Sequence, residues 1–376
     1  MWTAPGFEQV AEEFARNFAE RGEVGAAFAA YHRGELVVDL YGGTADPDTG
    51  RRWDHDTIHL MFSGTKGPTS ACVLLLMQRG QLSLTDPLSR YWPEFGANGK
   101  ESITIAEVLS HQARLPWVDA GYAELLDHDA MAAHLAAQAP AADPRAAFMY
   151  HPVTWGWLLD ELVRRVDGRT VGRFFAEEFA QPLGLEVWIG LPEELHWRAA
   201  TMVAPEGVLV DGPWSDLNRP NPLWIPGAEK YWNTTEYRTA GLAAVGGYAT
   251  ARGMARFYAS LLDQTAGVLT RETVALAQRE IRRGTEPNWG SPMSYGAGFE
   301  LTEQPEQSGQ PEQPEQPKGF GHSGAGGSRH GAWPDREIAY SYLMNEVRVS
   351  PDPRPISLLT ALSAAGLSRG TRATAR

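Results

Sequence analysis

Ser63-Gly64-Thr65-Lys66 is the stretch of this sequence that says most about its fold and its chemistry. It places a hydroxyl and an amine three positions apart, where a helix is expected to begin that runs to about Arg79 and stops at Gly80. Only four of the 33 basic residues are lysines, so Lys rather than Arg at this position is informative. A desolvated ammonium can lose its proton and act as a base, whereas a guanidinium cannot. The pair fits a serine nucleophile beside its base, although the tetrapeptide by itself fits a capped surface helix equally well.

The bulk composition is that of an acidic globular protein. The 376 residues carry a net charge of −13, 43% of them are hydrophobic, and the sequence pI is about 5.3. A chain of this length can bury a large core and suggests two or three lobes. The acidic balance disfavours nucleic acid and anionic membranes as partners. The single cysteine, Cys72, lies in an apolar helical run and is expected to be a small buried side chain.

The first 22 residues favour an amphipathic helix rather than a targeting signal. They lack a charged start followed by an apolar block, and no run in the sequence approaches the length of a membrane span. We therefore expect a cytoplasmic protein.

Strand patterns stand at both ends of the chain and helical patterns dominate its middle. A helix is expected over 7–21, and a hairpin over 25–32 and 35–41 turns at Arg33-Gly34. Residues 102–190 favour helices, among them one from Pro152 to Val166. Another helix is expected over 251–263. The final part predicts strands over 295–301, from 319 onward and over 338–345, then a helix over 355–365.

This order predicts an α/β (α+β) fold in which an antiparallel sheet is assembled from the N- and C-terminal segments and flanked by helices. One lobe comprises 1–62 with 240–376, and a mainly helical lobe comprises 63–239. Residues 203–235, rich in Pro, Trp, Asn and Gly, predict a long loop over the site. The Glu/Gln/Pro repeat over 303–317 predicts a flexible loop, and 368–376 a frayed tail. Ser63 falls where the lobes meet, which is where ligand sites preferentially occur.

Other chemistries fit less well. Ser323 in Gly321-His322-Ser323-Gly324-Ala325 resembles the nucleophile elbow of α/β-hydrolases, but the only later histidine, His330, is too close in sequence to be its base. Acidic and histidine residues occur in loops without a recognisable metal-ligand spacing, so no metal and no cofactor are expected. No phosphate-binding loop is present.

Two further segments supply the parts that a serine nucleophile needs. Tyr150 precedes the helix that Pro152 is expected to open, where a phenol beside a cation could be acidified and relay protons. The glycines of 319–327 permit close backbone approach to a ligand.

Together, Ser63-x-x-Lys66, Tyr150 and His322-Ser323-Gly324 resemble the three motifs of the serine β-lactamase and penicillin-binding-protein superfamily. The likeness is to its class C-like branch, which includes the family VIII carboxylesterases, and it extends over most of the chain. The resemblance implies that Ser63 attacks a carbonyl while Lys66 and Tyr150 share proton transfer. Which of the two is the base stays open. It also implies an oxyanion hole made by the backbone N–H groups of Ser63 and Ala325, with His322 at the third-motif cation position.

Two departures from the family pattern shift the expected substrate. Where β-lactamases have Asn two residues after the tyrosine, this chain has Pro152, which lacks a donor. His322 replaces a lysine and would be only partly charged near neutral pH, so a substrate carboxylate would be held less firmly. Both departures favour esters or thioesters over β-lactams.

We therefore expect a serine esterase that acts through an acyl-enzyme on a small ester, thioester or amide. An acyltransferase or thioesterase that passes the acyl group to an amine or alcohol, including peptide cyclisation, is the alternative. β-Lactamase activity and an inactive binding protein are less favoured, and the oligomeric state cannot be read. The expected pocket residues are Trp117, Trp155, Trp224, Ser323 and Gly324.

Overall fold

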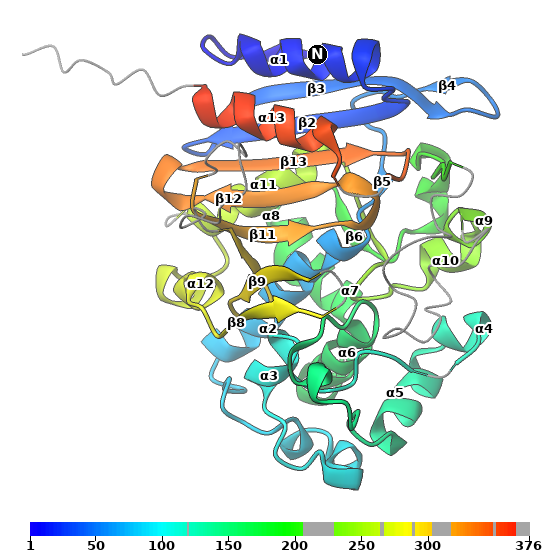
Figure 1. Cartoon of the computed structure of the whole chain (residues 1–376), viewed down its shortest axis with the longest axis vertical. Coiled ribbons are helices and arrows are strands. Elements are labelled where there is room, and N and C mark those ends of the chain that lie inside the picture. Colours follow the sequence, from blue (N-terminus) through cyan, green and yellow to red (C-terminus); the bar gives the residue numbers. More distant parts are fainter. Residues whose placement is uncertain are drawn as a thin grey trace, which may run out of the picture.

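The computed structural model describes residues 1–118, 120–205, 229–263, 267–287, 290–302, 317–348 and 351–365. Within these ranges one ten-stranded antiparallel sheet dominates the fold (Figure 1). Its order is β1 (Trp2–Thr3), β3 (Glu35–Asp46), β2 (Gly25–His32), β13 (Ile338–Met344), β12 (Arg329–Trp333), β11 (Gly319–Ser323), β10 (Glu300–Thr302), β9 (Ser291–Tyr295) and β8 (Arg282–Glu286), with the short β4 (Arg51–Arg52) paired to β3.

The two ends of the chain meet in the middle of this sheet. β2 pairs with β13 along its length, from Ile338 opposite His32 to Met344 opposite Ala26. The β2–β3 hairpin turns at Arg33 and Gly34, whose φ angles of 54° and 81° are the left-handed values that a tight hairpin turn requires. The predicted fold class, with a sheet assembled from both termini, is therefore confirmed.

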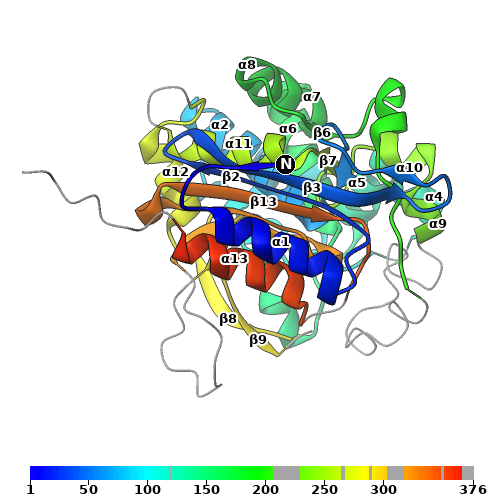
Figure 2. The ribbon, with the colours of Figure 1, turned by 90° about the horizontal axis from the view of Figure 1, so that it is seen from above.

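Helices cover both faces of the sheet. α1 (Glu8–Glu20) and α13 (Pro353–Ala364) lie side by side on one face, as Figure 2 shows. Phe7, Val10 and Phe14, which recur at helical spacing, are buried against that face. α2 (Lys66–Gln78), α11 (Ala251–Leu262) and α12 (Arg271–Gln278) lie on the opposite side. Cys72 is buried in α2, as expected.

The middle of the chain is mainly helical and packs below the sheet in the view of Figure 1. Its helices are α3 (Ile105–Leu109), α4 (Tyr122–Leu125), α5 (His128–Ala137), α6 (Thr154–Asp167), α7 (Val171–Phe175), α8 (Gln181–Leu183), α9 (Glu229–Trp232) and α10 (Thr235–Thr239). A three-stranded sheet joins β5 (His59–Leu60), β7 (Gly247–Ala249) and β6 (Val187–Ile189) and leads directly into Ser63. The boundaries of the two lobes stay a prediction.

Several element predictions were wrong in detail. The single strand predicted over 295–301 is two strands, β9 and β10, because the chain reverses at Gly296–Phe299, where Gly298 has a φ of 84°. α6 begins at Thr154 rather than at Pro152. β8, β12 and α12 were not predicted, and α9 occupies part of the loop expected over 203–235. Residues 206–228, 303–316 and 366–376, which hold most of that loop, nearly all of the Glu/Gln/Pro segment and the expected tail, lie outside the described residues.

Candidate active site

Ser63 stands on a braced turn between β5 and α2. It opens a short 3-10 turn, Ser63–Thr65, directly after Phe62, which has a φ of 45° and a ψ of −126°. A positive φ is unfavourable for a residue with a side chain and must be held by its surroundings. The Thr65 hydroxyl donates to the Phe62 carbonyl at 2.5 Å and accepts from the Gly247 N–H at 2.8 Å. Thr65 therefore links the Ser63–Thr65 turn, called the nucleophile turn below, to β7.

Lys66 is completely buried, and its amine lies among three oxygen atoms. Nζ donates to the carbonyl of Pro152 at 2.8 Å and to that of Ala244 at 3.2 Å, and it lies 3.3 Å from Ser63 Oγ. Burial lowers the pKa of Lys66 well below its ordinary value. A neutral amine has two N–H groups and one lone pair. The two carbonyls account for both N–H groups and leave the lone pair to Ser63.

Tyr150 approaches the same serine from the other side. Its hydroxyl donates to Ser63 Oγ at 2.8 Å, and its backbone N–H donates to a Glu286 carboxylate oxygen at 3.0 Å. Burial, followed by the negative charge of Glu300, raises the pKa of Tyr150 well above 10. The expectation of an acidified phenol was therefore wrong, because burial and a nearby negative charge both disfavour the ionised form of the hydroxyl.

His322 lies on the opposite wall, near the end of β11. Its ring centroid is 6.1 Å from that of Tyr150, and Nδ1 lies 2.7 Å from the Ser323 carbonyl oxygen. Burial lowers the pKa of His322 more than the neighbouring Glu300 raises it. The imidazole is therefore mainly neutral near neutral pH, with even less charge than the partly charged group that was expected.

The two backbone segments named for the oxyanion hole lie close together. Ser63 and Ala325 are each the first residue of a 3-10 turn, where the turn itself offers no acceptor for the N–H group. A Cβ atom on Gly324 would lie 2.3 Å from the Met61 carbonyl oxygen, so only glycine allows the end of β11 to approach the nucleophile turn this closely.

The predicted pocket residues are only partly brought together. Trp155 is fully buried, with its ring centroid 5.7 Å from Lys66 Nζ. It therefore belongs to the core and does not line an open pocket. Ser323 and Gly324 lie at the end of β11 beside His322. Trp117 is half-buried in the loop that follows α3, where its carbonyl accepts from Gln138. Trp224 lies outside the described residues.

Sequence reasoning missed three groups at this site. His111 packs its ring 4.5 Å from that of Tyr150 and accepts from the His151 N–H at 3.1 Å, which positions the tyrosine. Glu300 binds Ser323, and the Ala244 carbonyl binds Lys66. The backbone of His111 has a φ of 62°, which depends on the folded chain and not on a local pattern. Glu300 and the Ala244 carbonyl bind residues that lie far from them in sequence, so local patterns could not have revealed these two groups either.

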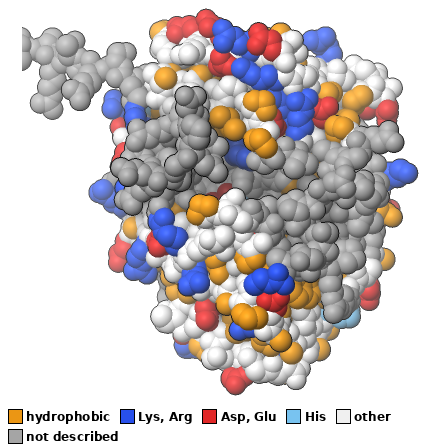
Figure 3. Space-filling view, viewed as in Figure 1, with side chains coloured by type: hydrophobic (Ala, Val, Ile, Leu, Met, Phe, Trp, Pro, Cys, Tyr) orange, Lys and Arg blue, Asp and Glu red, His pale blue; other side chains and the backbone are white. Residues whose placement is uncertain are grey.

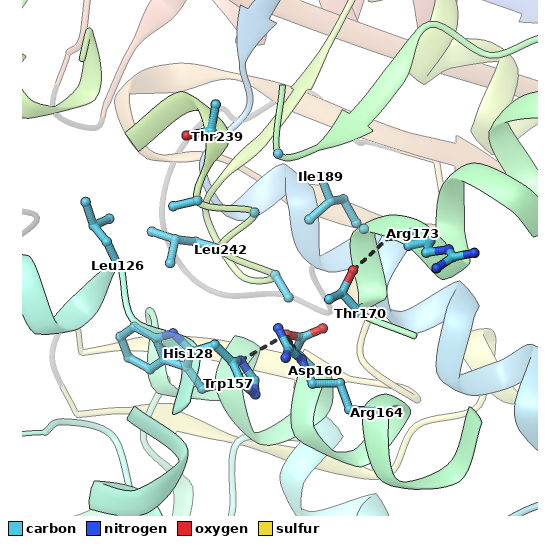
Figure 4. Close-up of a pocket in the computed structure, with 15 residues that line it drawn as sticks. Leu126, His128, Trp157, Asp160, Arg164, Thr170, Arg173, Ile189, Thr239 and Leu242 are labelled. Atoms are coloured by element: carbon cyan, nitrogen blue, oxygen red, sulfur yellow. Dashed lines mark hydrogen bonds and ion pairs between the residues drawn. The ribbon is translucent and has the colours of Figure 1, made fainter. Parts of the chain in front are cut away.

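A separate cavity of about 210 Å³ is lined by residues of α6 together with the segments around Ile189 and Leu242 (Figure 4). Trp157, Ile189 and Leu242 form apolar walls, and His128 and Asp160 form an ion pair at its base. Burial opposes a charge on His128, but hydrogen bonds to Asp160 and Glu161 outweigh it and raise the pKa of His128 to about 9. This network joins α5 to α6.

The described residues contain no group of three or more His, Cys, Asp or Glu side chains arranged to hold a metal ion. In the same ranges, none of the helices has the length and apolar character needed to span a bilayer.

Comparison with known proteins identifies the family. The β-lactamase family profile matches residues 10–364. An esterase/β-lactamase, LipL, of Mycobacterium tuberculosis (strain ATCC 25618 / H37Rv) is 32% identical over 361 residues, which cover 91% of this chain and 82% of the relative. The chain therefore belongs to the β-lactamase family, as the three motifs predicted.

Solved structures agree with this assignment. A penicillin-binding-protein homologue from Caulobacter crescentus is 34% identical with a TM-score of 0.84, over 97% of this chain and 98% of its own. A family VIII carboxylesterase is 33% identical with a TM-score of 0.84, over 96% of this chain and 98% of its own. The likeness falls on the esterase-like branch that the sequence indicated.

Proposed function

We propose that this protein is a serine hydrolase that cleaves carboxylic esters through an acyl-enzyme on Ser63. The observation that carries the proposal is the amine of Lys66, buried and held by the Pro152 and Ala244 carbonyls within 3.3 Å of Ser63 Oγ. The esterase and carboxylesterase among the relatives support the choice of ester as substrate.

Lys66 is the better candidate for the general base. In acylation, Ser63 Oγ bonds to the substrate carbonyl carbon while its proton moves to Lys66 Nζ. The tetrahedral intermediate then expels the alcohol oxygen, which takes up a proton through the Tyr150 hydroxyl, and Lys66 restores that proton. The lowered pKa of Lys66 and the raised pKa of Tyr150 both support this division of roles.

The N–H groups of Ser63 and Ala325 would stabilise the negative oxygen of the tetrahedral intermediate, where a single donor typically contributes about 3 kcal/mol. Deacylation reverses the sequence with water in place of the alcohol. Water bonds to the acyl carbon while its proton passes to Lys66, the bond between that carbon and Ser63 Oγ then breaks, and Oγ takes up the proton from Lys66 as the carboxylic acid is released.

The third-motif side of the cleft favours esters over β-lactams. A neutral His322 offers no positive charge to a substrate carboxylate, and Pro152 offers no side-chain donor to a substrate amide. Thioesters satisfy the same requirements, since they also need only an attacked carbonyl and an expelled leaving group.

Mass spectrometry of the intact protein tests the proposal. Incubation with short p-nitrophenyl esters, thioesters and a β-lactam should give an acyl adduct on Ser63 with the esters or thioesters, together with released alcohol or thiol. Ser63→Ala should give neither adduct nor turnover. Turnover that survived in Ser63→Ala would contradict the proposal.

Transfer of the acyl group to an amine or alcohol stays the alternative, and adding an amine to the same incubation would reveal it as amide product. A cytoplasmic location and the absence of nucleic acid or membrane partners stay predictions. On the face shown in Figure 3, the described acidic and basic side chains are interspersed, which supports the prediction about nucleic acid.

A further inference from the structure

The third-motif wall carries a carboxylate that the sequence did not reveal. Glu300, on β10, accepts from the Ser323 N–H at 2.9 Å and from the Ser323 hydroxyl at 2.9 Å, and it lies 3.6 Å from His322 Nδ1. Ser323 was a predicted pocket residue, but both of its donors are engaged by this internal carboxylate. What the wall offers to a ligand is therefore an acceptor rather than a donor.

His322 adds a second acceptor to the same wall. Its Nδ1 contacts the Ser323 carbonyl, which can only accept, so Nδ1 carries the hydrogen and Nε2 keeps a lone pair. His322 is 2% exposed, and within the described residues Nε2 is buried without a hydrogen-bond partner. A buried polar atom without a partner is rare and indicates a ligand or a water molecule at that position.

The charge on Glu300 is not neutralised by a neighbouring cation. Among the described residues its ion-pair contact is with His322 alone, and neither Lys nor Arg lies within salt-bridge distance. The side chain retains 21% exposure, so solvent and ligands can reach it. The negative charge of Glu300 also acts on the catalytic groups. It raises the pKa of Tyr150 in the same direction as burial does, and it opposes the lowering of the pKa of Lys66 and of His322 by burial.

We propose that the Glu300–His322 wall selects esters that carry a cationic group on that side of the scissile bond and disfavours esters that carry a carboxylate there. The proposal rests on the ester hydrolysis proposed above and names the substrate class of the same site. A substrate ammonium would lie against Glu300 and, where it has a hydrogen to donate, would bond to His322 Nε2. A carboxylate would instead face a negative charge and a lone pair.

Isosteric esters isolate the effect of charge. A trimethylammonium group and a tert-butyl group have nearly the same shape, so acetylcholine and 3,3-dimethylbutyl acetate differ mainly by one positive charge, and an acetate ester of a hydroxyacid provides the negative member. A second series carries the same three groups on the acyl chain of a p-nitrophenyl ester, so that both sides of the scissile bond are probed. The measured quantity is the ratio of kcat/KM for the cationic and neutral members.

We expect the cationic member to exceed its neutral isostere by about three- to tenfold in at least one series, as expected for one partly screened charge, and the anionic member to fall below both. Glu300→Gln keeps an acceptor for Ser323 and should bring the ratio close to one. Glu337→Gln, which removes an exposed carboxylate from the β12–β13 connection, is the matched control and should leave the ratio unchanged.

Three outcomes decide the matter. Equal or reversed preference in both series, or a ratio unchanged in Glu300→Gln, overturns the proposal while ester hydrolysis stands. If no member is hydrolysed and Ser63 carries no acyl group, the proposed function itself fails. Should Glu300→Gln not fold, the wild-type ratio must fall as salt concentration rises, and a ratio independent of salt overturns the proposal equally.

Discussion

The Tyr150 hydroxyl donates to Ser63 Oγ at 2.8 Å, closer than the 3.3 Å between the same oxygen and the Lys66 amine. One serine oxygen is thus held between a hydroxyl whose pKa burial raises and an amine whose pKa burial lowers. The two groups arrive from different elements, since Lys66 follows Ser63 in α2 and Tyr150 precedes α6. The arrangement predicts that replacing Tyr150 and replacing Lys66 impair different steps of the reaction.

Tyr150→Phe should lower kcat for a p-nitrophenyl ester by about 10²- to 10⁴-fold, because the leaving oxygen loses its route to a proton. Steady-state kinetics with circular dichroism to verify folding would measure this. Tyr295→Phe is a suitable control, since Tyr295 is equally buried and its hydroxyl has no hydrogen-bond partner among the described residues. Rates within about twofold of wild type are expected for it. A Tyr150→Phe enzyme with near-normal kcat would contradict the relay role.

Lys66→Arg should abolish formation of the acyl-enzyme, because a guanidinium keeps the positive charge and cannot accept the proton of Ser63. Burst kinetics and mass spectrometry of the acyl adduct would measure the effect. Lys100 offers a matched control, since it is also buried and donates to the carbonyls of Ala97, Ala136 and Gln138, away from Ser63. Lys100→Arg should affect stability and leave acylation intact. Acylation at wild-type rates in Lys66→Arg would show that Lys66 is not the base.

Gly64→Ala should destabilise the nucleophile turn by about 1–3 kcal/mol, because overpacking of a filled site forces its neighbours to move. The added Cβ would lie 2.5 Å from the His330 ring. Chemical denaturation of Gly64→Ala, His330→Ala and the double variant forms a mutant cycle. We expect the double variant to be more stable than the sum of the single losses predicts. Strict additivity would indicate that the clash lies elsewhere.

The stability contribution of His128 should depend on pH. The pKa of about 9 in the folded protein lies above the ordinary 6.5, so the contribution is complete below about pH 6.5 and is lost as the pH rises through about 9. The difference in unfolding free energy between wild type and His128→Gln should therefore shrink by about 1–3 kcal/mol between pH 6 and pH 9.5. Denaturant melts at three pH values would measure it. A constant difference would mean that the ion pairs with Asp160 and Glu161 contribute nothing measurable.

Much of the sheet could be predicted because several of its strands have a clear local sequence pattern. The β2–β3 hairpin follows from two apolar runs joined at Arg33-Gly34, and β13 is a continuous buried run. The prediction of one strand over 295–301 failed because glycine residues set the direction of the backbone there. A run over 295–301 that appears as one strand is reversed at Gly296–Phe299, because Gly298 adopts a φ of 84° and the lack of a Cβ on Gly296 allows its close approach to the Ala277 carbonyl.

The nucleophile and its neighbour could also be predicted, since the spacing of Ser63 and Lys66 is set within a single turn and the start of a helix. Tyr150 and His322 followed from the order of the motifs. Their protonation did not follow, since the expectation of an acidified Tyr150 was wrong and burial leaves His322 even less charged than expected. A pKa depends on how completely the packed chain excludes water from a group, and a motif carries no record of that.

Short-range spacing and the order of the motifs were enough to predict which side chains gather around Ser63 in the candidate active site. The pKa shifts of those side chains and their hydrogen-bond partners follow only from the folded chain. The Ala244 carbonyl, 178 positions from Lys66, binds its amine, and Glu300 reaches Ser323 from the neighbouring strand of the sheet. Burial and charge are properties of the assembled surroundings, and folding brings those surroundings together from segments that are distant in the chain.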